Sequence, residues 1–125
     1  MDLVREFRRG AVALHVLHHA SDGTVHGAWL SEELARHGYR ISPGTLYPLL
    51  HRMADAGLIR GSEELIDGRV LRRYRATKRG EEVLADLRGV IRELADEVGS
   101  DGGANADSSR PRRRVATREA ISRRT

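Results

Sequence analysis

The sequence contains no cysteine, few aromatic residues and no long apolar run. Without cysteine, its 125 residues can form no disulfide, thiolate zinc site or thiol nucleophile, which is typical of a protein from a reducing compartment. Aromatic residues make up 4% and charged residues 32%, which favours a polar helical protein over a sandwich or barrel. No stretch reaches the ~18 apolar residues that would cross a membrane, and the acidic Met1-Asp2 start does not resemble a signal peptide. We expect a soluble, cytoplasmic protein with no membrane partner.

The sequence also has no recognisable catalytic motif. It lacks a glycine-rich phosphate loop, a framed pair of carboxylates and a nucleophile motif. A chain of this length builds one domain with a modest core, too shallow for the site of a hydrolase or transferase. We therefore expect a protein that is not an enzyme and requires no cofactor.

Charge is abundant, and it is sorted along the chain. Residues 36–79 hold ten lysines and arginines against four acids, and residues 80–97 hold two arginines against six acids. Residues 110–125 carry seven arginines and a single acid. Such segregation of basic from acidic segments is typical of proteins that bind nucleic acid.

Apolar spacing and turn residues predict three helices in the first half of the chain. The first covers residues 3–20 and is closed by a turn at 21–23, and the second covers residues 27–37. The third begins with Ser42 as N-cap and Pro43 as first residue, and it ends at Gly57. The first helix carries its apolar stripe at Leu3, Phe7, Ala11 and Leu14, and the third faces inward with Leu46, Leu49, Leu50 and Met53.

A β-hairpin and a long helix follow. Asp67-Gly68 is a strong two-residue turn signal, and a hairpin closed there pairs Ile66 with Arg69 and Glu63 with Arg72. The last helix is capped near residue 77 and runs to about residue 98. Residues 99–125 are expected to form a disordered, arginine-rich tail, which either adds sequence-independent affinity for DNA or only aids solubility.

This order of elements predicts a mainly α fold with a two-stranded β-hairpin. Three helices followed by a hairpin match the winged helix-turn-helix, whose second helix of the pair enters the DNA major groove. An unrelated small α+β domain could share the order. The winged helix-turn-helix hypothesis divides the chain into a DNA-binding domain (1–76), a C-terminal dimerisation helix (77–98) and the tail (99–125).

Several spaced motifs resemble one family. His26-Gly27 opens the second helix, Ser42 to Pro48 read SPGTLYP, and Gly68-Arg69 stands at the hairpin turn. The full segments are HGAWLSEELARHGYRISPGTLYPLLHRMADAGLI and DGRVLRRYRATKRGEEVL. They resemble the PadR family of bacterial transcriptional regulators over about residues 3–98. The resemblance implies a winged helix, dimerisation through the last helix, and repression relieved by a small effector.

The chain departs from this family at the start of the second helix. The family usually has an aromatic residue directly after His-Gly, whereas this chain has Ala28 there and its aromatic at Trp29. The outer surface of the second helix is therefore expected to differ. We favour a packing role for Trp29.

Two prolines stand near the front of the third helix. Pro43 lies in the first turn, where a missing N–H costs little. Pro48 leaves the Gly44 carbonyl unpaired if the helix begins at Pro43, and costs almost nothing if it begins nearer Thr45. In both cases the front end is stiffened, which suits a helix that approaches phosphates and bases.

The resemblance indicates that the third helix and the hairpin contact double-stranded DNA. The alternative for the helix is an ordinary solvated face. In the hairpin, Arg69 and Arg73 are expected to reach DNA, while Arg72 stays paired with Glu63. The expected DNA contacts are Ser42, Gly44, Thr45, Tyr47, Pro48, His51, Arg52, Arg69 and Arg73.

The last helix carries apolar residues at spacings of three, four, three and four, which predict an a/d seam. A second copy is the simplest partner, because a twofold dimer matches a palindromic operator. The alternative is packing onto the first helix, and we expect both. The seam consists of Leu84, Leu87, Ile91, Leu94 and Val98.

Histidines of the first helix form a possible metal site with one that follows it. His15, His18 and His19 share a helix face and His26 is a short loop away, although a structural role is favoured. The effector stays open between a small aromatic or drug-like molecule and a divalent metal. Other readings are a metal-responsive repressor and a protein-interaction module that uses the winged fold without DNA.

Overall fold

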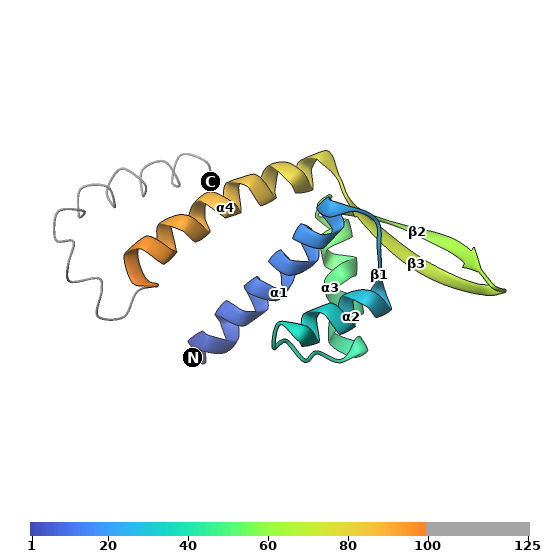
Figure 1. Cartoon of the computed structure of the whole chain (residues 1–125), viewed down its shortest axis with the longest axis horizontal. Helices are drawn as coiled ribbons and strands as arrows, with labels where there is room; N and C mark the ends of the chain where they lie inside the picture. Colours follow the sequence, from blue (N-terminus) through green and yellow to red (C-terminus); the bar gives the residue numbers. More distant parts are fainter. Residues whose placement is uncertain (100–125) are drawn as a thin grey trace. The chain divides into compact units, whose positions relative to one another are not determined.

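A computed structural model describes residues 1–99 of the chain (Figure 1). Contacts divide it into two compact units, residues 1–84 and a part that begins at Ala85. Apart from Gly99, the expected arginine-rich tail lies outside the described residues. The elements are α1 (Leu3–Asp22), β1 (Val25–His26), α2 (Gly27–Arg36), α3 (Pro43–Asp55), β2 (Ile59–Ile66), β3 (Arg69–Ala76) and α4 (Lys78–Val98).

The first three helices and the sheet enclose one hydrophobic core. The inward face predicted for α3 is confirmed, since Leu46, Leu50 and Met53 are buried and Leu49 packs at the edge of the core. Burying a side chain of this size contributes about 1.5–3 kcal/mol. The other helices contribute Val12, Val16, Leu17 and Ala20 from α1, Leu30 and Leu34 from α2, and Leu84 from α4.

The first helix buries a different stripe from the predicted one. Its buried residues begin only at Val12, in the middle of the helix, whereas Leu3, Val4 and Phe7 at its beginning are exposed, Phe7 to 65%. Large apolar side chains grouped on an exposed helix face commonly mark an interaction surface. None of the described helices is long and apolar enough to span a membrane.

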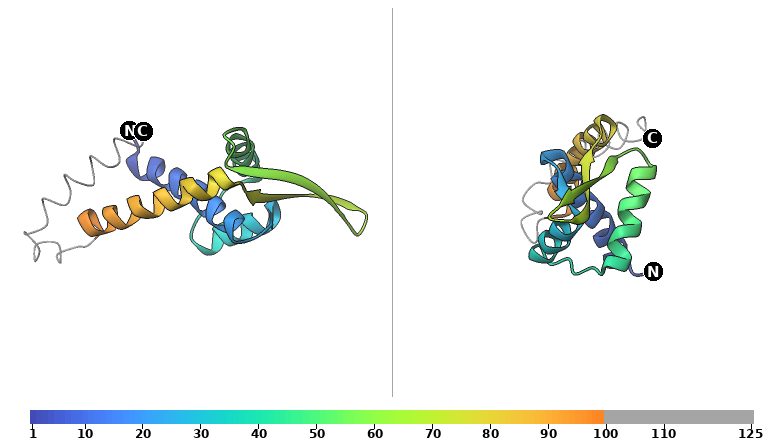
Figure 2. Two further views of the ribbon diagram at one scale, coloured as in Figure 1. Left: turned by 90° about the horizontal axis from the view of Figure 1, so that it is seen from above. Right: turned by 90° about the vertical axis from the view of Figure 1, so that its right-hand side faces the viewer.

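The predicted hairpin is confirmed, and a third strand joins it. The register pairs Ile66 with Arg69 and Glu63 with Arg72, and Asp67 and Gly68 both have positive φ (50° and 76°), as a type I′ turn requires. The sheet also has a strand that was not predicted, because β1 pairs with β3 to give the order β1-β3-β2. Figure 2 shows the hairpin extending well beyond the helices that hold its base.

The start of α4 is fastened to the loop after α3. The Thr77 hydroxyl donates to the Gly57 carbonyl (2.6 Å), and its oxygen accepts from the Gly80 N–H (3.0 Å), which confirms the cap predicted near residue 77. Gly80 is buried against the Leu58 carbonyl, where a Cβ would overlap the oxygen. The first turns of α4 therefore belong to the unit that carries α3 and the hairpin.

Candidate nucleic-acid interface

The outer face of α3 carries the residues expected to contact DNA, and all of them are exposed. The helix begins at Pro43, so Pro48 lies inside it and the Gly44 carbonyl has no N–H four residues on to accept from. Ser42 holds the N-cap position, but its hydroxyl pairs with that of Thr45 (3.3 Å) and caps no backbone N–H. The N–H groups of Thr45 and Leu46 donate to the Ser42 carbonyl, so the Gly44 N–H is the first-turn amide that is left for an incoming anion.

The start of α2 helps to position this face. The ring of Tyr47 lies over Gly27, where a Cβ would come within 2.7 Å of the Tyr47 hydroxyl oxygen. Only glycine allows the ring this close approach without a shift of the side chain. The spacing between the His-Gly pair and Tyr47 thus reflects packing of α3 against α2, and Tyr47 stays half-exposed.

The arginines of the hairpin differ in their surroundings. Arg69 stands exposed at the turn. Arg73 is held, since its Nη1 lies 2.9 Å from Glu64 Oε2 and its Nε donates to the Ser62 hydroxyl (3.3 Å). The expected Glu63–Arg72 pair is opposite in register, yet no ion pair joins the two side chains within the described residues. Arg73, rather than Arg72, is the arginine with an acidic partner.

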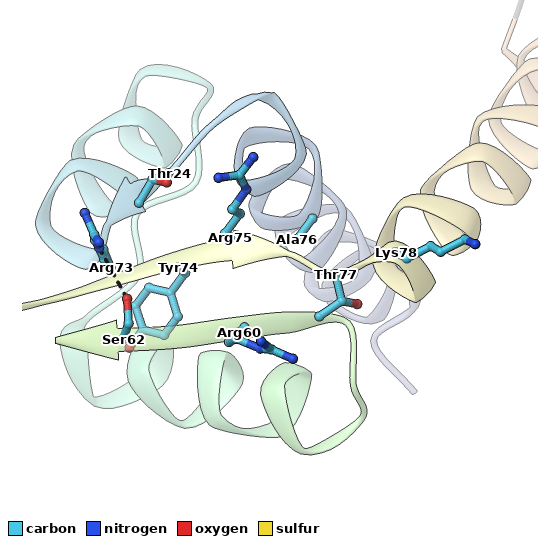
Figure 3. A pocket seen from close by; sticks show the side chains of 9 residues that line it. All are labelled: Thr24, Arg60, Ser62, Arg73, Tyr74, Arg75, Ala76, Thr77 and Lys78. Atoms are coloured by element: carbon cyan, nitrogen blue, oxygen red, sulfur yellow. Dashed lines mark hydrogen bonds between the residues drawn. The ribbon is translucent and has the colours of Figure 1, made fainter.

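A basic groove of about 410 Å³ lies at the base of the hairpin (Figure 3). Arg60 of β2 lies directly opposite Arg75 of β3, and Lys78 begins α4 beside them. None of these three cations forms an ion pair within the described part of the chain. The groove is lined by Thr24, Arg60, Ser62, Arg73, Tyr74, Arg75, Ala76, Thr77 and Lys78.

Sequence reasoning did not find this groove. The predicted hairpin register, which pairs Ile66 with Arg69, also places Arg60 opposite Arg75. This opposition of two arginines was the sequence feature that could have indicated the groove. Like charges directly opposite in a sheet repel each other. Figure 3 shows the two side chains pointing away from each other, so each guanidinium group can form a charge-assisted hydrogen bond to an anion of its own.

The predicted histidines separate into different environments. His15 and His19 lie together and are joined by His37, which follows α2. His18 is exposed, and His26 Nε2 lies 3.1 Å from Glu64 Oε1. Burial is the main reason why the pKa values of His15 and His19 are lowered.

The residues predicted for dimerisation fall into a buried group and an exposed group. Leu84 is 3% exposed and belongs to the core of its own chain, and Leu87 is partly buried. Ile91, Leu94 and Val98 are exposed, Val98 to 72%. An apolar face therefore continues along α4 after the first unit ends.

Three helices with an exposed third helix, followed by an arginine-bearing hairpin, define the winged helix-turn-helix class of DNA-binding fold. The model of the "Transcriptional regulator PadR-like family" matches residues 16–86. The chain belongs to this family, whose members are transcriptional regulators and not enzymes.

Relatives and solved structures agree with this assignment. The "Transcriptional regulator Rv3488" of Mycobacterium tuberculosis is 57% identical over 95 residues, which cover 76% of this chain and 89% of that protein. A PadR family regulator from Eggerthella lenta is 33% identical with a TM-score of 0.69, covering 78% of this chain and 86% of that chain. A PadR-like regulator from Bacillus cereus is 29% identical with a TM-score of 0.69, covering 75% and 93%.

Proposed function

We propose that this regulator is a homodimeric repressor that binds a palindromic operator and is released by a small effector. The proposed DNA contact is supported best by the presence of an exposed α3 face together with an arginine-bearing hairpin. The buried side of α3 is fixed in the core, while its opposite side presents only exposed residues, among them Thr45, His51 and Arg52. Such a helix suits the major groove, and an arginine-tipped hairpin suits the adjacent minor groove.

The basic groove adds a surface for phosphates. Arg60, Arg75 and Lys78 are clustered there without acidic partners in residues 1–99. Contacts of this kind position a protein on the duplex but read no sequence. We therefore assign base contacts to α3 and backbone contacts to the groove.

Dimerisation is supported by the apolar faces of α1 and α4. Leu3, Val4 and Phe7 of α1 are exposed, as are Ile91, Leu94 and Val98 of α4. A second copy buries such faces and gives the twofold symmetry that a palindrome requires. Repression then follows if the dimer covers a promoter, and a small effector that favours another arrangement of the dimer relieves it.

The test is binding of the full chain to DNA from upstream of its own gene, followed by fluorescence anisotropy. The double variant Arg52→Ala/Arg69→Ala should lose about tenfold or more in affinity, and the slope of log K against log salt should fall by about two. Arg92→Ala removes an exposed arginine of α4 and should change neither quantity. Unchanged affinity of the double variant would favour the protein-interaction module.

A further inference from the structure

Two pairs of possible metal ligands meet between α1 and α2. His15 and His19 are four residues apart on α1, and Glu33 and His37 are four residues apart on α2 and its C-cap. Residues at this spacing share one face of a helix, so each helix presents two ligands. One ring nitrogen of each histidine lies within 4.8 Å of those of the other two.

Glu33 lies beside two of the three rings, those of His37 and His19, and its other oxygen faces Arg36. Its Oε2 is 3.1 Å from His37 Nε2 and 3.6 Å from His19 Nε2, and its side chain is mostly shielded from solvent. The first distance is a hydrogen bond and the second is too long for one. Among residues 1–99, His19 Nε2 is a buried side-chain nitrogen with no hydrogen-bond partner.

The buried nitrogen of His19 is a polar atom that a metal ion would satisfy. It faces the Glu33 carboxylate at 3.6 Å and lies within the group of three ring nitrogens. A cation placed between an imidazole nitrogen and a carboxylate is bound by both.

We infer that His15, His19, His37 and Glu33 form a binding site for a divalent transition-metal ion such as Zn²⁺. Three imidazole nitrogens and one carboxylate oxygen match the ligand types and the four-coordinate geometry of zinc. Zn–N bonds of about 2.0–2.1 Å hold tetrahedral ligands about 3.4 Å apart, so the nitrogens must approach by at most about 1.4 Å. The half-exposed His37, just after the last residue of α2, has room for this movement.

A bound ion would join α1 to the end of α2 that leads into α3. It would stabilise the unit that carries the candidate DNA surface, because a ligand of the folded state raises its stability. The binding itself does not depend on the proposed function.

The first experiment titrates the full chain, freed of metal by chelation, with Zn²⁺ and with Co²⁺. We expect saturable uptake of one ion per chain and the visible absorption of tetrahedral Co²⁺. Trp29 is the only tryptophan and meets the His19 ring edge to face at 5.2 Å, so its fluorescence should change in step with uptake. Mg²⁺ prefers oxygen ligands and should produce neither signal.

Variants then assign the ligands. His37→Ala removes an exposed ligand and should weaken Zn²⁺ binding by at least about tenfold, since losing even a group that orients a ligand costs this much. His18→Ala, on the same helix but outside the four residues, should bind as the parent chain does. Thermal melts in chelator establish that both variants fold.

Several outcomes would overturn the site. The parent chain could show no saturable uptake up to millimolar Zn²⁺. His37→Ala could leave the Zn²⁺ affinity unchanged, or His18→Ala could weaken Zn²⁺ binding as much as His37→Ala does. A separate measurement of operator binding with and without Zn²⁺ rests on the proposed function. If zinc binds while no DNA is bound under any condition, the proposed function fails and the metal site stands.

Discussion

At the scale of single residues, the most informative feature is the opposition of Arg60 and Arg75 across the hairpin. The two side chains point away from each other, so the repulsion between their charges is weak, and no carboxylate pairs with either within the described residues. Phosphates of the DNA backbone would attract both guanidinium groups. Stability and DNA affinity should therefore respond in opposite directions to the loss of one arginine.

Arg60→Thr is expected to raise the melting temperature and weaken DNA binding. Threonine suits a strand, and relief of the weak repulsion adds about 0.2 kcal/mol. The lost phosphate contact should lower the salt slope of DNA binding by about one. Thermal melts and anisotropy at several salt concentrations measure both, and Arg92→Ala is the control. A lower melting temperature, or an unchanged salt slope, would contradict the role of the groove.

Two glycines of α4 give a matched pair of substitutions. At Gly80 a Cβ overlaps the Leu58 carbonyl, so Gly80→Ala should destabilise the protein by about 1–3 kcal/mol. At Gly89 no atom of the described residues lies within 4 Å of the added Cβ, so Gly89→Ala should stabilise the protein by about 0.5–1 kcal/mol through helix propensity. Urea unfolding measures both changes. A neutral Gly80→Ala would show that the start of α4 is not held against the loop after α3.

At the scale of elements, local rules predicted most of the fold. The turn at Asp67-Gly68 set the hairpin register, and the apolar spacing of α3 identified its buried face, because turn type and helical period are properties of neighbouring residues. The Thr77 cap was likewise predictable, because it depends on neighbouring residues.

The features that the sequence did not predict depend on contacts between distant residues. Strand β1 has two residues, too few to show a period, and it exists because Val25 lies opposite Tyr74. His37 joins His15 and His19 only because α2 packs against α1. The partner of Arg73 was also not predicted, because Glu64 reaches it diagonally across the sheet rather than from the opposite position.

Glu64 links the strands of the sheet, with Arg73 on one oxygen and His26 on the other. Glu64→Gln should weaken that link and free Arg73, lowering stability by no more than about 1 kcal/mol because the groups are partly exposed. DNA affinity should rise a few-fold, and the salt slope should increase by about one. Glu63→Gln removes the same charge without releasing an arginine, so the difference between the variants isolates Arg73. Equal effects of Glu64→Gln and Glu63→Gln on DNA affinity and salt slope would exclude Arg73 as a DNA contact.

At the scale of the whole molecule, charge and apolar surface occupy different parts of the chain. Cations dominate residues 36–79, while acids dominate residues 80–97 of α4. The acidic helix would be repelled by DNA, and its exposed Ile91, Leu94 and Val98 have no place in a DNA contact. This division fits a DNA-binding unit joined to a helix that associates with a second copy.

Ile91→Glu together with Leu94→Glu should convert the proposed dimer to a monomer. Both side chains are exposed within one chain, so the fold of residues 1–84 should survive, while two buried charges at the interface of a dimer would be strongly unfavourable. Sedimentation equilibrium measures the association. The monomer should bind a single half-site as the parent chain does, but lose most of its affinity for the palindrome.

The control for this variant is Arg92→Glu, which lies between the two substituted positions but off the a/d seam. It changes the net charge by the same amount as the double variant, so it separates the effect of charge from the effect of the apolar face. Arg92→Glu should remain dimeric, and its affinity for the palindrome should exceed that of the double variant. A parent chain that sediments as a monomer, or a double variant that stays dimeric, would show that this face of α4 does not hold two copies together.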